Sequence, residues 1–216
     1  MERPGWVRVD CHLHTALSGD AVTTIDELAE RVAQNQLDVV CITDHNVTEA
    51  AVAAAERGIG ARVIVGEEIR TRDGDLIGLF LAERIPYVIP LSEAVAMIKA
   101  QSGLVYLPHP FDPGRSSLRH EAEQLCADGI VDVIEVFNAK IEDQTLNKQA
   151  ADLAARYGIP GGAGSDAHDP EGIGAAYLEI PDFDGPSDFL AKLAVAEITG
   201  EHRPHAIRYP RGGLRS

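Results

Sequence analysis

Cysteine is scarce in this chain, and the few cysteines show no pattern of a metal site. The 216 residues contain three cysteines, Cys11, Cys41 and Cys126, and no Cys-x-x-Cys pair. Cys11 and Cys41 fall in or beside expected core strands, where a free cysteine behaves as a small apolar side chain. We therefore expect buried, reduced thiols rather than metal ligands.

Positive charge is also in short supply. The chain has 19 Lys and Arg against 34 Asp and Glu, which gives a net charge of −15. This balance argues against an electrostatic grip on nucleic acid or on an anionic membrane. We therefore expect neither a membrane partner nor stable binding of duplex nucleic acid. Bound divalent ions would cancel part of the charge locally, so a nucleotide or a short RNA remains compatible with the sequence.

Long apolar runs and the usual nucleotide-binding motifs are absent as well. No apolar stretch approaches the roughly 18 residues needed to span a bilayer, and residues 1–5 lead straight into an expected strand rather than a signal peptide. A cytoplasmic location is expected. The glycine-rich pieces at 58–60 and 161–164 lack both Gly-x-Gly-x-x-Gly spacing and a Walker lysine. Nucleotide binding through those motifs is not supported.

The chain does contain five short clusters of histidine and acidic residues, each placed after an apolar segment. Imidazole and carboxylate are donors that divalent cations bind in proteins. One such cluster would be weak evidence. Five of them, at expected strand exits in a chain with only 8 histidines, predict one metal site assembled from distant segments. The clusters are Asp10-Cys11-His12-Leu13-His14, Thr43-Asp44-His45, Gly66-Glu67-Glu68, Pro108-His109-Pro110 and Gly164-Ser165-Asp166-Ala167-His168.

Strand-like and helix-like segments alternate along the chain, which indicates an α/β fold with parallel strands and right-handed crossovers. Thr24 and Glu27 form an expected capping box at the start of the first helix. The remaining expected helices cover 48–57, 92–101, 117–127, 143–157 and 187–197. The expected strands cover 7–11, 38–43, 62–66, 75–82, 104–107, 131–136, 159–164 and 176–180, and the pair at 62–66 and 75–82 is expected to be antiparallel.

An open doubly wound sheet and a closed barrel both fit this alternation, but the clusters favour the barrel. Active-site residues of such barrels come from several strand ends on one face. An open sheet gathers its ligands at a single switch point instead. We expect one barrel domain over residues 1–202, with the metal site at the C-terminal ends of the strands, and a basic tail over 203–216.

The ordered clusters resemble the polymerase and histidinol phosphatase (PHP) family, and the likeness covers about residues 7–180. It implies a distorted (β/α)7 barrel that holds two or three divalent ions and hydrolyses phosphate esters. Zinc, manganese or iron(II) is expected, and magnesium is left open. The implied metal ligands are His12, His14, Glu68 and Asp166 at a first position, Glu68 and His109 at a second, and Asp20, His45 and His168 at a third.

Two features depart from the family pattern. Asp75 stands where several relatives carry a second-position histidine. Asp75 either ligates as a harder donor, which favours manganese, iron(II) or magnesium, or leaves that position weak or empty. Glu67 lies beside Glu68, and on a strand the two side chains point to opposite faces. The family spacing selects Glu68 as the ligand.

The expected chemistry is hydrolysis of a phosphoric ester bond by a metal-bound hydroxide. Glu68, Asp166 and Arg115 are the expected catalytic residues, with Asp166 guiding the proton of the water. Arg115 and Asn138 are the expected substrate contacts, and Glu135 is a weaker candidate. Arg115 has an equally good explanation as a solvated loop residue.

Three functions are compatible with these residues. The first is a phosphoesterase acting on a small phosphorylated metabolite, a nucleotide or a short oligonucleotide end. The second is a phosphomonoesterase of the histidinol-phosphatase type, and the third is a catalytically silent, metal-stabilised binding module. The basic tail either aids solubility or contacts a second phosphate of the substrate. Its arginines are Arg203, Arg208, Arg211 and Arg215.

Overall fold

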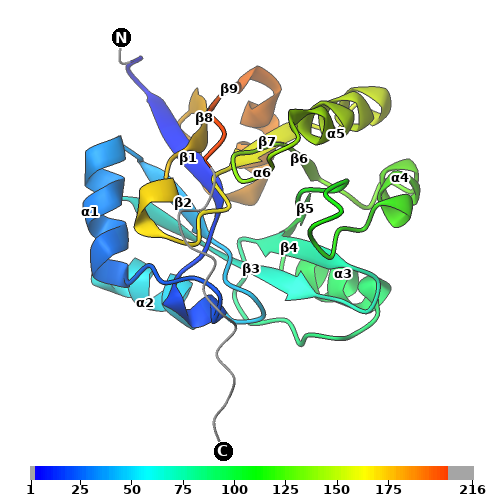
Figure 1. Ribbon diagram of the computed structural model, residues 1–216, viewed down its shortest axis with the longest axis horizontal. Helices are drawn as coiled ribbons and strands as arrows, with labels where there is room; N and C mark the ends of the chain where they lie inside the picture. Colours follow the sequence, from blue (N-terminus) through cyan, green and yellow to red (C-terminus); the bar gives the residue numbers. More distant parts are fainter. Residues whose placement is uncertain (1–2, 204–216) are drawn as a thin grey trace, which may run out of the picture.

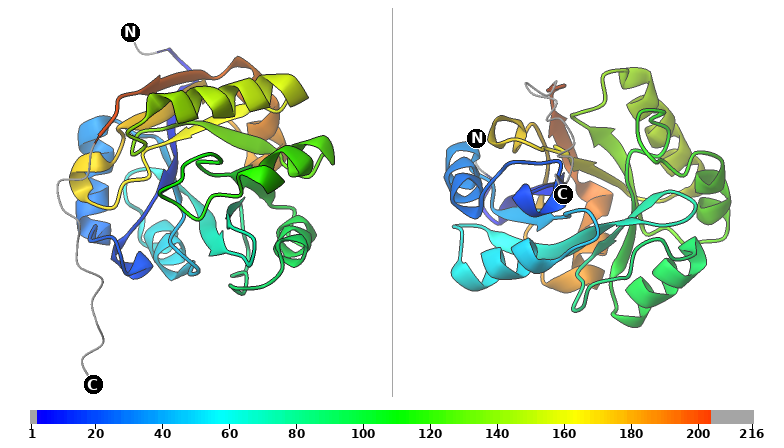
Figure 2. Two further views of the ribbon diagram at one scale, coloured as in Figure 1. Left: turned by 45° about the vertical axis from the view of Figure 1, so that its right-hand side comes forward. Right: turned by 60° about the horizontal axis from the view of Figure 1, so that its bottom comes forward.

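The apolar, β-branched segments form one mixed sheet that curls into a nearly closed barrel, with helices packed around its outside (Figures 1 and 2). The computed structural model describes residues 3–203. Its strands are β1 (Trp6–Leu13), β2 (Val39–Ile42), β3 (Arg62–Arg70), β4 (Asp75–Leu79), β5 (Leu104–Leu107), β6 (Val133–Asn138), β7 (Gly161–Gly164), β8 (Ala176–Pro181) and β9 (Glu197–Gly200). Its helices are α1 (Ile25–Asn35), α2 (Glu49–Arg57), α3 (Leu91–Ala100), α4 (His120–Ala127), α5 (Gln144–Tyr157) and α6 (Gly185–Lys192), with short 3-10 turns at Ala16–Ser18, Pro170–Gly172 and Leu193–Val195.

The sheet runs in the order β7-β6-β5-β4-β3-β2-β1-β8-β9. β1, β2 and β3 are parallel, as are β5, β6 and β7, whereas β4 is antiparallel to both of its neighbours. The barrel closes where β1 passes the end of β7. There Asp166 N donates to His12 O at 2.7 Å and His14 N donates to Ala167 O at 3.0 Å. The expected distorted barrel is confirmed.

A shift of register in β1 decides where its histidines point. The pairing with β2 is regular up to Asp10 and resumes at Leu13, so β1 carries an extra residue between them. Val9 and Cys11 pack inside the barrel, whereas Leu13 packs outside against α1. A bulge re-aims the side chains that follow it. Here it turns His12 into the mouth of the barrel.

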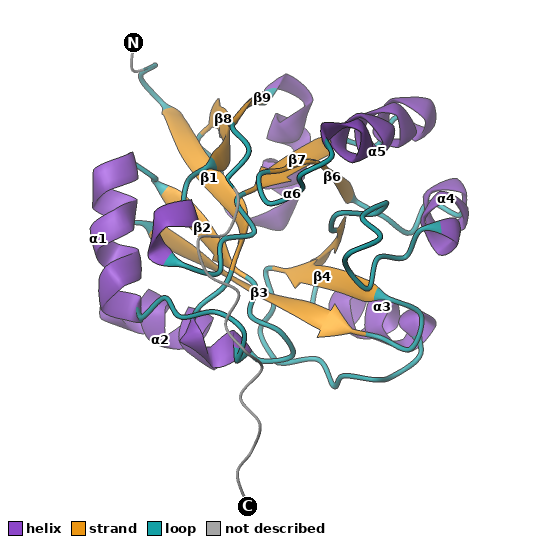
Figure 3. Cartoon of the chain, in the orientation of Figure 1, coloured by secondary structure: helices purple, strands orange, loops and turns teal. Residues whose placement is uncertain are grey.

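Two apolar layers hold the fold together. Residues from the strands fill the barrel interior, and Phe183, just before α6, and Phe189, on α6, join that layer. Two further clusters lie between the sheet and the surrounding helices, which Figure 3 shows outside the strands. Cys11, Cys41 and Cys126 are buried and free, as expected.

Glycine in β7 allows the barrel to close. A Cβ on Gly164 would lie 2.4 Å from His12 Cβ and 2.8 Å from His12 N. Contacts this short do not occur between real side chains, so β1 could approach β7 this closely only at glycine. Glycine at position 164 of β7 is therefore required for β1, the strand that carries His12, to pack this closely.

Local sequence signals place most helices correctly. Thr24 Oγ1 accepts from Glu27 N at 3.2 Å while Glu27 Oε2 accepts from Thr24 N at 2.9 Å, so the capping box is present. The expected helix at 187–197 is wrong in its second half. α6 ends at Lys192, and β9 pairs antiparallel with β8. The unpaired edge of β8 offers backbone hydrogen bonds, which override a weak helical pattern.

The basic tail falls almost wholly outside the described residues. Only Arg203 of its four arginines is described, so the role of the tail stays a prediction. Within residues 3–203, every helix is too short or too polar to cross a membrane.

Glu67 and Glu68 point to opposite sides of β3, as strand alternation requires. Glu67 is fully buried against the loop that follows β4, where its Oε2 accepts from Ile85 N at 2.7 Å. Its Oε1 has no hydrogen-bond partner among the described residues. Burial raises the pKa of Glu67 to about 7. The folded chain therefore favours the protonated form of this carboxyl.

Replacing Glu67 with Gln should stabilise the chain increasingly as pH rises. The folded-state pKa of Glu67 lies above its unfolded value, so this group's contribution to stability is present at low pH and is lost as pH rises through about 7. Gln can still accept from Ile85 N and never ionises. We expect the advantage of Glu67→Gln over wild type to grow by roughly 2 kcal/mol between pH 5 and pH 8 in urea unfolding. Glu83→Gln, an exposed change in the same loop, is the control, and a pH-independent advantage would contradict the argument.

Candidate metal centre

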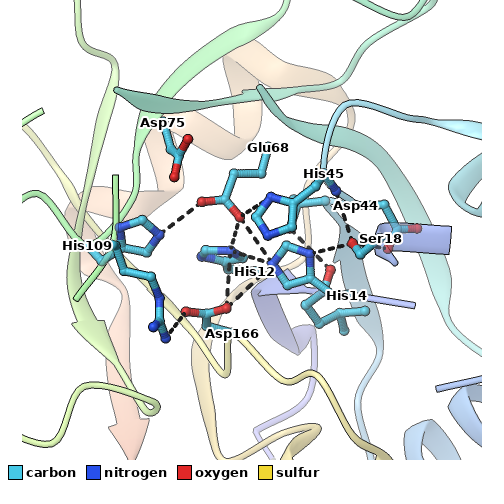
Figure 4. A network of polar contacts seen from close by, with 12 residues as sticks. His12, His14, Ser18, Asp44, His45, Glu68, Asp75, His109 and Asp166 are labelled. Carbon is cyan, nitrogen blue, oxygen red and sulfur yellow. Dashed lines mark hydrogen bonds and ion pairs between the residues drawn. The ribbon is translucent and has the colours of Figure 1, made fainter. Parts of the chain in front are cut away.

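The five sequence clusters meet at one mouth of the barrel, where the parallel strands end (Figure 4). The parallel strands deliver them because their C-terminal ends share one face. Three overlapping groups of donors each lie within 4.8 Å. Together these groups contain His12, His14, His45, Glu68, His109, Asp166 and His168.

The innermost, first position is formed by two imidazoles and two carboxylates. His12 Nε2 and His14 Nε2 lie 3.1 Å apart. Glu68 Oε2 lies 3.3 Å from the first nitrogen and 3.2 Å from the second, and Asp166 Oδ1 lies 3.7 and 3.5 Å from them. All four side chains are almost completely buried. Their donor atoms thus converge on one point that water scarcely reaches.

The hydrogen bonds on the far side of each ring show that this point fits a cation. His12 Nδ1 lies 2.9 Å from Glu135 Oε1, so its N–H donates there. His14 Nδ1 lies 2.9 Å from Ser18 Oγ, whose hydroxyl donates to Asp44 Oδ1 at 2.8 Å. Both protons are therefore on Nδ1, which leaves two Nε2 lone pairs facing each other and two carboxylates. Lone pairs and anions in such contact call for a shared positive ion.

The charges of the centre favour the same conclusion. Burial alone lowers the pKa of His12, but the carboxylates of Glu135, Asp166 and Glu68 outweigh burial and raise it well above its usual range. Burial favours protonated Glu68, yet His45, His12 and His109 hold its pKa well below the usual range. The carboxylates remain charged and attract positive charge to the cluster. A divalent ion supplies that charge without a proton.

The second position lies on the other oxygen of Glu68. His109 Nε2 lies 2.9 Å from Glu68 Oε1, and His12 completes this donor group. His109 has a backbone φ of 27°, which is uncommon outside glycine, and the flanking chain holds it there. Its Nδ1 faces Ser117 Oγ at 3.3 Å. Glu68 is thus placed to bridge the first and second positions.

Asp75 is buried near this second position but is engaged elsewhere. Arg70 Nε donates to Asp75 Oδ1 at 2.6 Å, and the carboxyl is outside the three donor groups. Burial, together with the charge of Glu68, raises the pKa of Asp75. This arrangement agrees better with a second position left weak or empty than with direct ligation by Asp75. A ligand role for Asp75 stays a prediction.

The third position is the most exposed. His14, His45 and His168 form its donor group, and Asp20 Oδ2 lies 3.4 Å from His45 Nε2 and 3.5 Å from His168 Nε2. Asp20 keeps about half of its side chain exposed. Burial works against the charged carboxylate, but the two imidazoles hold the pKa of Asp20 well below its usual range. Burial and the nearby His14 lower the pKa of His168 to about 4, which keeps this ring neutral.

Two buried carboxylates outside the donor groups orient the ligands. Glu135 accepts from His12 on one oxygen and from His109 N and Asn138 Nδ2 on the other. Asp44 accepts from Thr15 N at 2.6 Å and from Ser18. Such partners fix the tautomer and direction of metal-binding imidazoles. The sequence signal for Glu135 was its place on the interior face of a strand. Ser18 gave no comparable signal.

The two predicted substrate contacts differ in accessibility. Arg115 keeps about a quarter of its side chain exposed, and its Nη2 lies 3.3 Å from Asp166 Oδ2. Asn138 is fully buried, and its amide donates to Glu135 Oε2 at 2.9 Å and to Asp166 Oδ2 at 3.2 Å. Arg115 can meet a ligand at the mouth. Asn138 instead holds Asp166 in place, and its substrate contact stays a prediction.

Lys140 is a cation of the site that sequence reasoning missed. Its Nζ lies 3.3 Å from Asp166 Oδ1, and 2.8 and 3.0 Å from Nδ1 and Nε2 of His168, and only a tenth of the side chain is exposed. The residue belongs to none of the five clusters. Lys140 lies far in sequence from the cluster at 164–168, so no local pattern predicted its contact with Asp166 and His168.

Known proteins are similar to this chain in sequence and in fold. The PHP domain model matches residues 10–157, and the model of a PHP-associated segment matches residues 144–197. The uncharacterized protein MJ0417 of Methanocaldococcus jannaschii is 34% identical over 203 residues, which cover 88% of this chain and 80% of that protein.

Solved structures show the same fold at lower identity. PsfC from Pseudomonas syringae superposes with a TM-score of 0.67 at 19% identity, covering 91% of this chain and 92% of PsfC. A two-domain protein from Bacteroides vulgatus that contains a predicted PHP-like metal-dependent phosphoesterase superposes with a TM-score of 0.66 at 19% identity. The match covers 81% of this chain and 58% of that protein. Because the PHP domain model matches residues 10–157, this chain belongs to the PHP family.

Proposed function

We propose that this protein is a metal-dependent phosphoesterase. Its proposed substrates are a small phosphorylated metabolite, a nucleotide or a short oligonucleotide end. The observation that carries the proposal is that donor groups linked by His12 and His14 bring Glu68 and Asp166 together, while two cations, Arg115 and Lys140, contact Asp166. Metal donors beside fixed cations suit a tetrahedral, multiply charged anion better than a neutral ester.

The first position, with His12, His14, Glu68 and Asp166, and the second, with Glu68 and His109, would hold divalent ions. Such ions, when bound, lower the pKa of water and offset the charge that builds up on phosphate oxygens during attack. Zinc, manganese and iron(II) all accept this mixture of imidazole and carboxylate, and the donor set favours none of them decisively.

The side chains of the mouth have separate tasks in this proposal. Arg115 would bind phosphate oxygens through its planar guanidinium. Burial favours protonation of Asp166, but Lys140, His12 and Arg115 hold its pKa well below the usual range. Asp166 therefore stays charged and would orient the attacking water by accepting a hydrogen bond at Oδ1. Asn138 fixes its other oxygen.

Access to the centre favours a terminal phosphate. His12, His14, Glu68 and Asp166 are almost completely buried, whereas His45 keeps 22% and Arg115 keeps 27% of the side chain exposed. A phosphate group could enter past these two residues. The backbone of a duplex could not approach the buried carboxylates without unfolding the mouth. This supports a small phosphorylated substrate and agrees with the acidic charge of the chain.

We expect at least two divalent ions per chain after purification without chelator. Elemental analysis measures their number. Chelation should also lower the melting temperature, because the buried carboxylates and lone pairs lose their shared cation. Added Mn²⁺ should restore it. A folded chain that retains less than one equivalent after reconstitution would contradict the metal centre.

Replacing Glu68 with Gln should abolish turnover, whereas replacing Glu67 with Gln should preserve most of it. Glu68 contacts four imidazoles of the centre, while Glu67 faces the opposite side of β3. We expect the loss in kcat/KM for Glu68→Gln to exceed the roughly 100-fold seen for partners outside the donor set. The assay measures release of phosphate from an aryl phosphate and from mononucleotides with Mn²⁺ present.

Equal losses in the two variants would show that the wrong carboxylate was assigned. Full metal occupancy without turnover of phosphomonoesters, nucleotides or short RNA would contradict the proposed phosphoesterase activity. It would support the alternative of a catalytically silent binding module.

A further inference from the structure

Lys140 lies against His168 and Asp166, at the edge of the centre where a third metal ion would bind. His168 Nδ1 lies 2.9 Å from Asp166 O, so its N–H donates to that carbonyl and the ring's lone pair is on Nε2. Nε2 is the atom that faces Asp20, and Lys140 Nζ lies against the same ring, 3.0 Å from Nε2 and 2.8 Å from Nδ1. The same ammonium lies 3.3 Å from Asp166 Oδ1. One protein cation thus engages both the imidazole and the carboxylate at this edge of the centre.

The backbone holds Lys140 in that place from both sides. Lys140 N donates to Asn138 Oδ1 at 2.9 Å, and Ala139 N donates to Gly164 O at 3.1 Å. Ala139 O accepts from Arg203 N at 2.9 Å and from His202 Nδ1 at 3.1 Å. A segment fixed by four hydrogen bonds presents its side chain toward the metal ligands. A buried ammonium must remain near its partners, because an unpaired buried charge is costly.

At the other two positions Lys140 contacts a single donor, Asp166 Oδ1 of the first position, and the remaining donors there are imidazoles and Glu68. Glu68, which the two positions share, is contacted by His12, His14, His45 and His109. At the third position, a metal ion bonded to His168 Nε2 at about 2.0–2.1 Å would lie close to the ammonium, and like charges repel strongly at that range. The carboxylate available there, Asp20, is half-exposed and a weak replacement.

We propose that Lys140 is a built-in competitor for the third metal position and makes the resting centre a two-ion site. The proposal rests on the metal centre of the proposed function. Lys140 acts through Asp166 and His168, so it is a positioning residue. A third ion would bind only by displacing the ammonium from His168, which links occupancy of that position to movement of Lys140.

The test measures metal binding rather than turnover. Chelator-stripped, full-length protein is titrated with Mn²⁺, with free ion counted by electron paramagnetic resonance and heats recorded by calorimetry. Wild type should bind two ions tightly and a third weakly. Lys140→Met should bind the third ion roughly tenfold or more tightly, because the competing charge is gone. Lys140→Arg keeps the charge and should retain weak binding.

A matched control separates the local effect from a change in net charge. Lys148 lies on α5 with about three quarters of its side chain exposed and pairs with Asp152. Lys148→Met removes the same charge and should bind Mn²⁺ as wild type does. Lys140→Gln repeats the experiment if the Met variant does not fold.

Three results would overturn the proposal. One is an unchanged third affinity in folded Lys140→Met or Lys140→Gln, even if KM for a phosphate ester rises, because Lys140 would then serve the substrate alone. A wild type that binds three ions tightly is another. A wild type that binds fewer than two ions removes the proposed metal centre itself, which distinguishes that failure from the failure of the Lys140 role.

Discussion

The contact on which the centre depends is that of one carboxylate with four imidazoles. Glu68 Oε2 lies 3.2–3.3 Å from ring nitrogens of His12, His14 and His45, and its Oε1 lies 2.9 Å from His109. A buried carboxylate with this many nitrogen neighbours is stable only when positive charge is shared among them. Protons or metal ions can provide it. The other side chains of the mouth favour metal ions over protons as the source of this positive charge.

That arrangement consists of fixed hydrogen bonds behind the ligands. Glu135 accepts a hydrogen bond from His12 Nδ1, and Ser18 Oγ accepts one from His14 Nδ1. The metal-facing nitrogens keep lone pairs as a result. His109 and Asp166 are held in left-handed backbone conformations with φ of 27° and 49°. Strain of this kind persists where surrounding contacts determine the geometry, as at ligand sites.

In the proposed function, the distribution of charge gives the centre its selectivity. The chain as a whole is acidic, yet Arg115 and Lys140 meet at Asp166 in the mouth. A substrate attracted by these two cations and by bound ions must be anionic and small enough to reach them. We propose a second effect of Lys140 on the same edge, because an ammonium against the His168 ring would compete with an ion bound there.

The sequence by itself determined the fold class and the donors. Apolar strand patterns, capping signals such as Thr24 and Gly158, and the acid and histidine clusters depend on residues close together in the chain, so they can be predicted without contacts. Strand alternation, which is local, also predicted that Glu67 and Glu68 point to opposite faces, and the family resemblance selected Glu68. This is why the barrel was expected correctly and why the histidine and acid clusters could be placed at its strand ends.

Only the tertiary structure decided how those donors are aimed and balanced. The extra residue in β1 that turns His12 inward arises from pairing with β2, and β9 forms because β8 offers an open edge. The contact between Lys140 and His168 joins strand exits 28 residues apart in the chain. Register, edge pairing and long-range charge contacts depend on which segments become neighbours in space. That information is absent from any local stretch of sequence and appears only when the barrel closes.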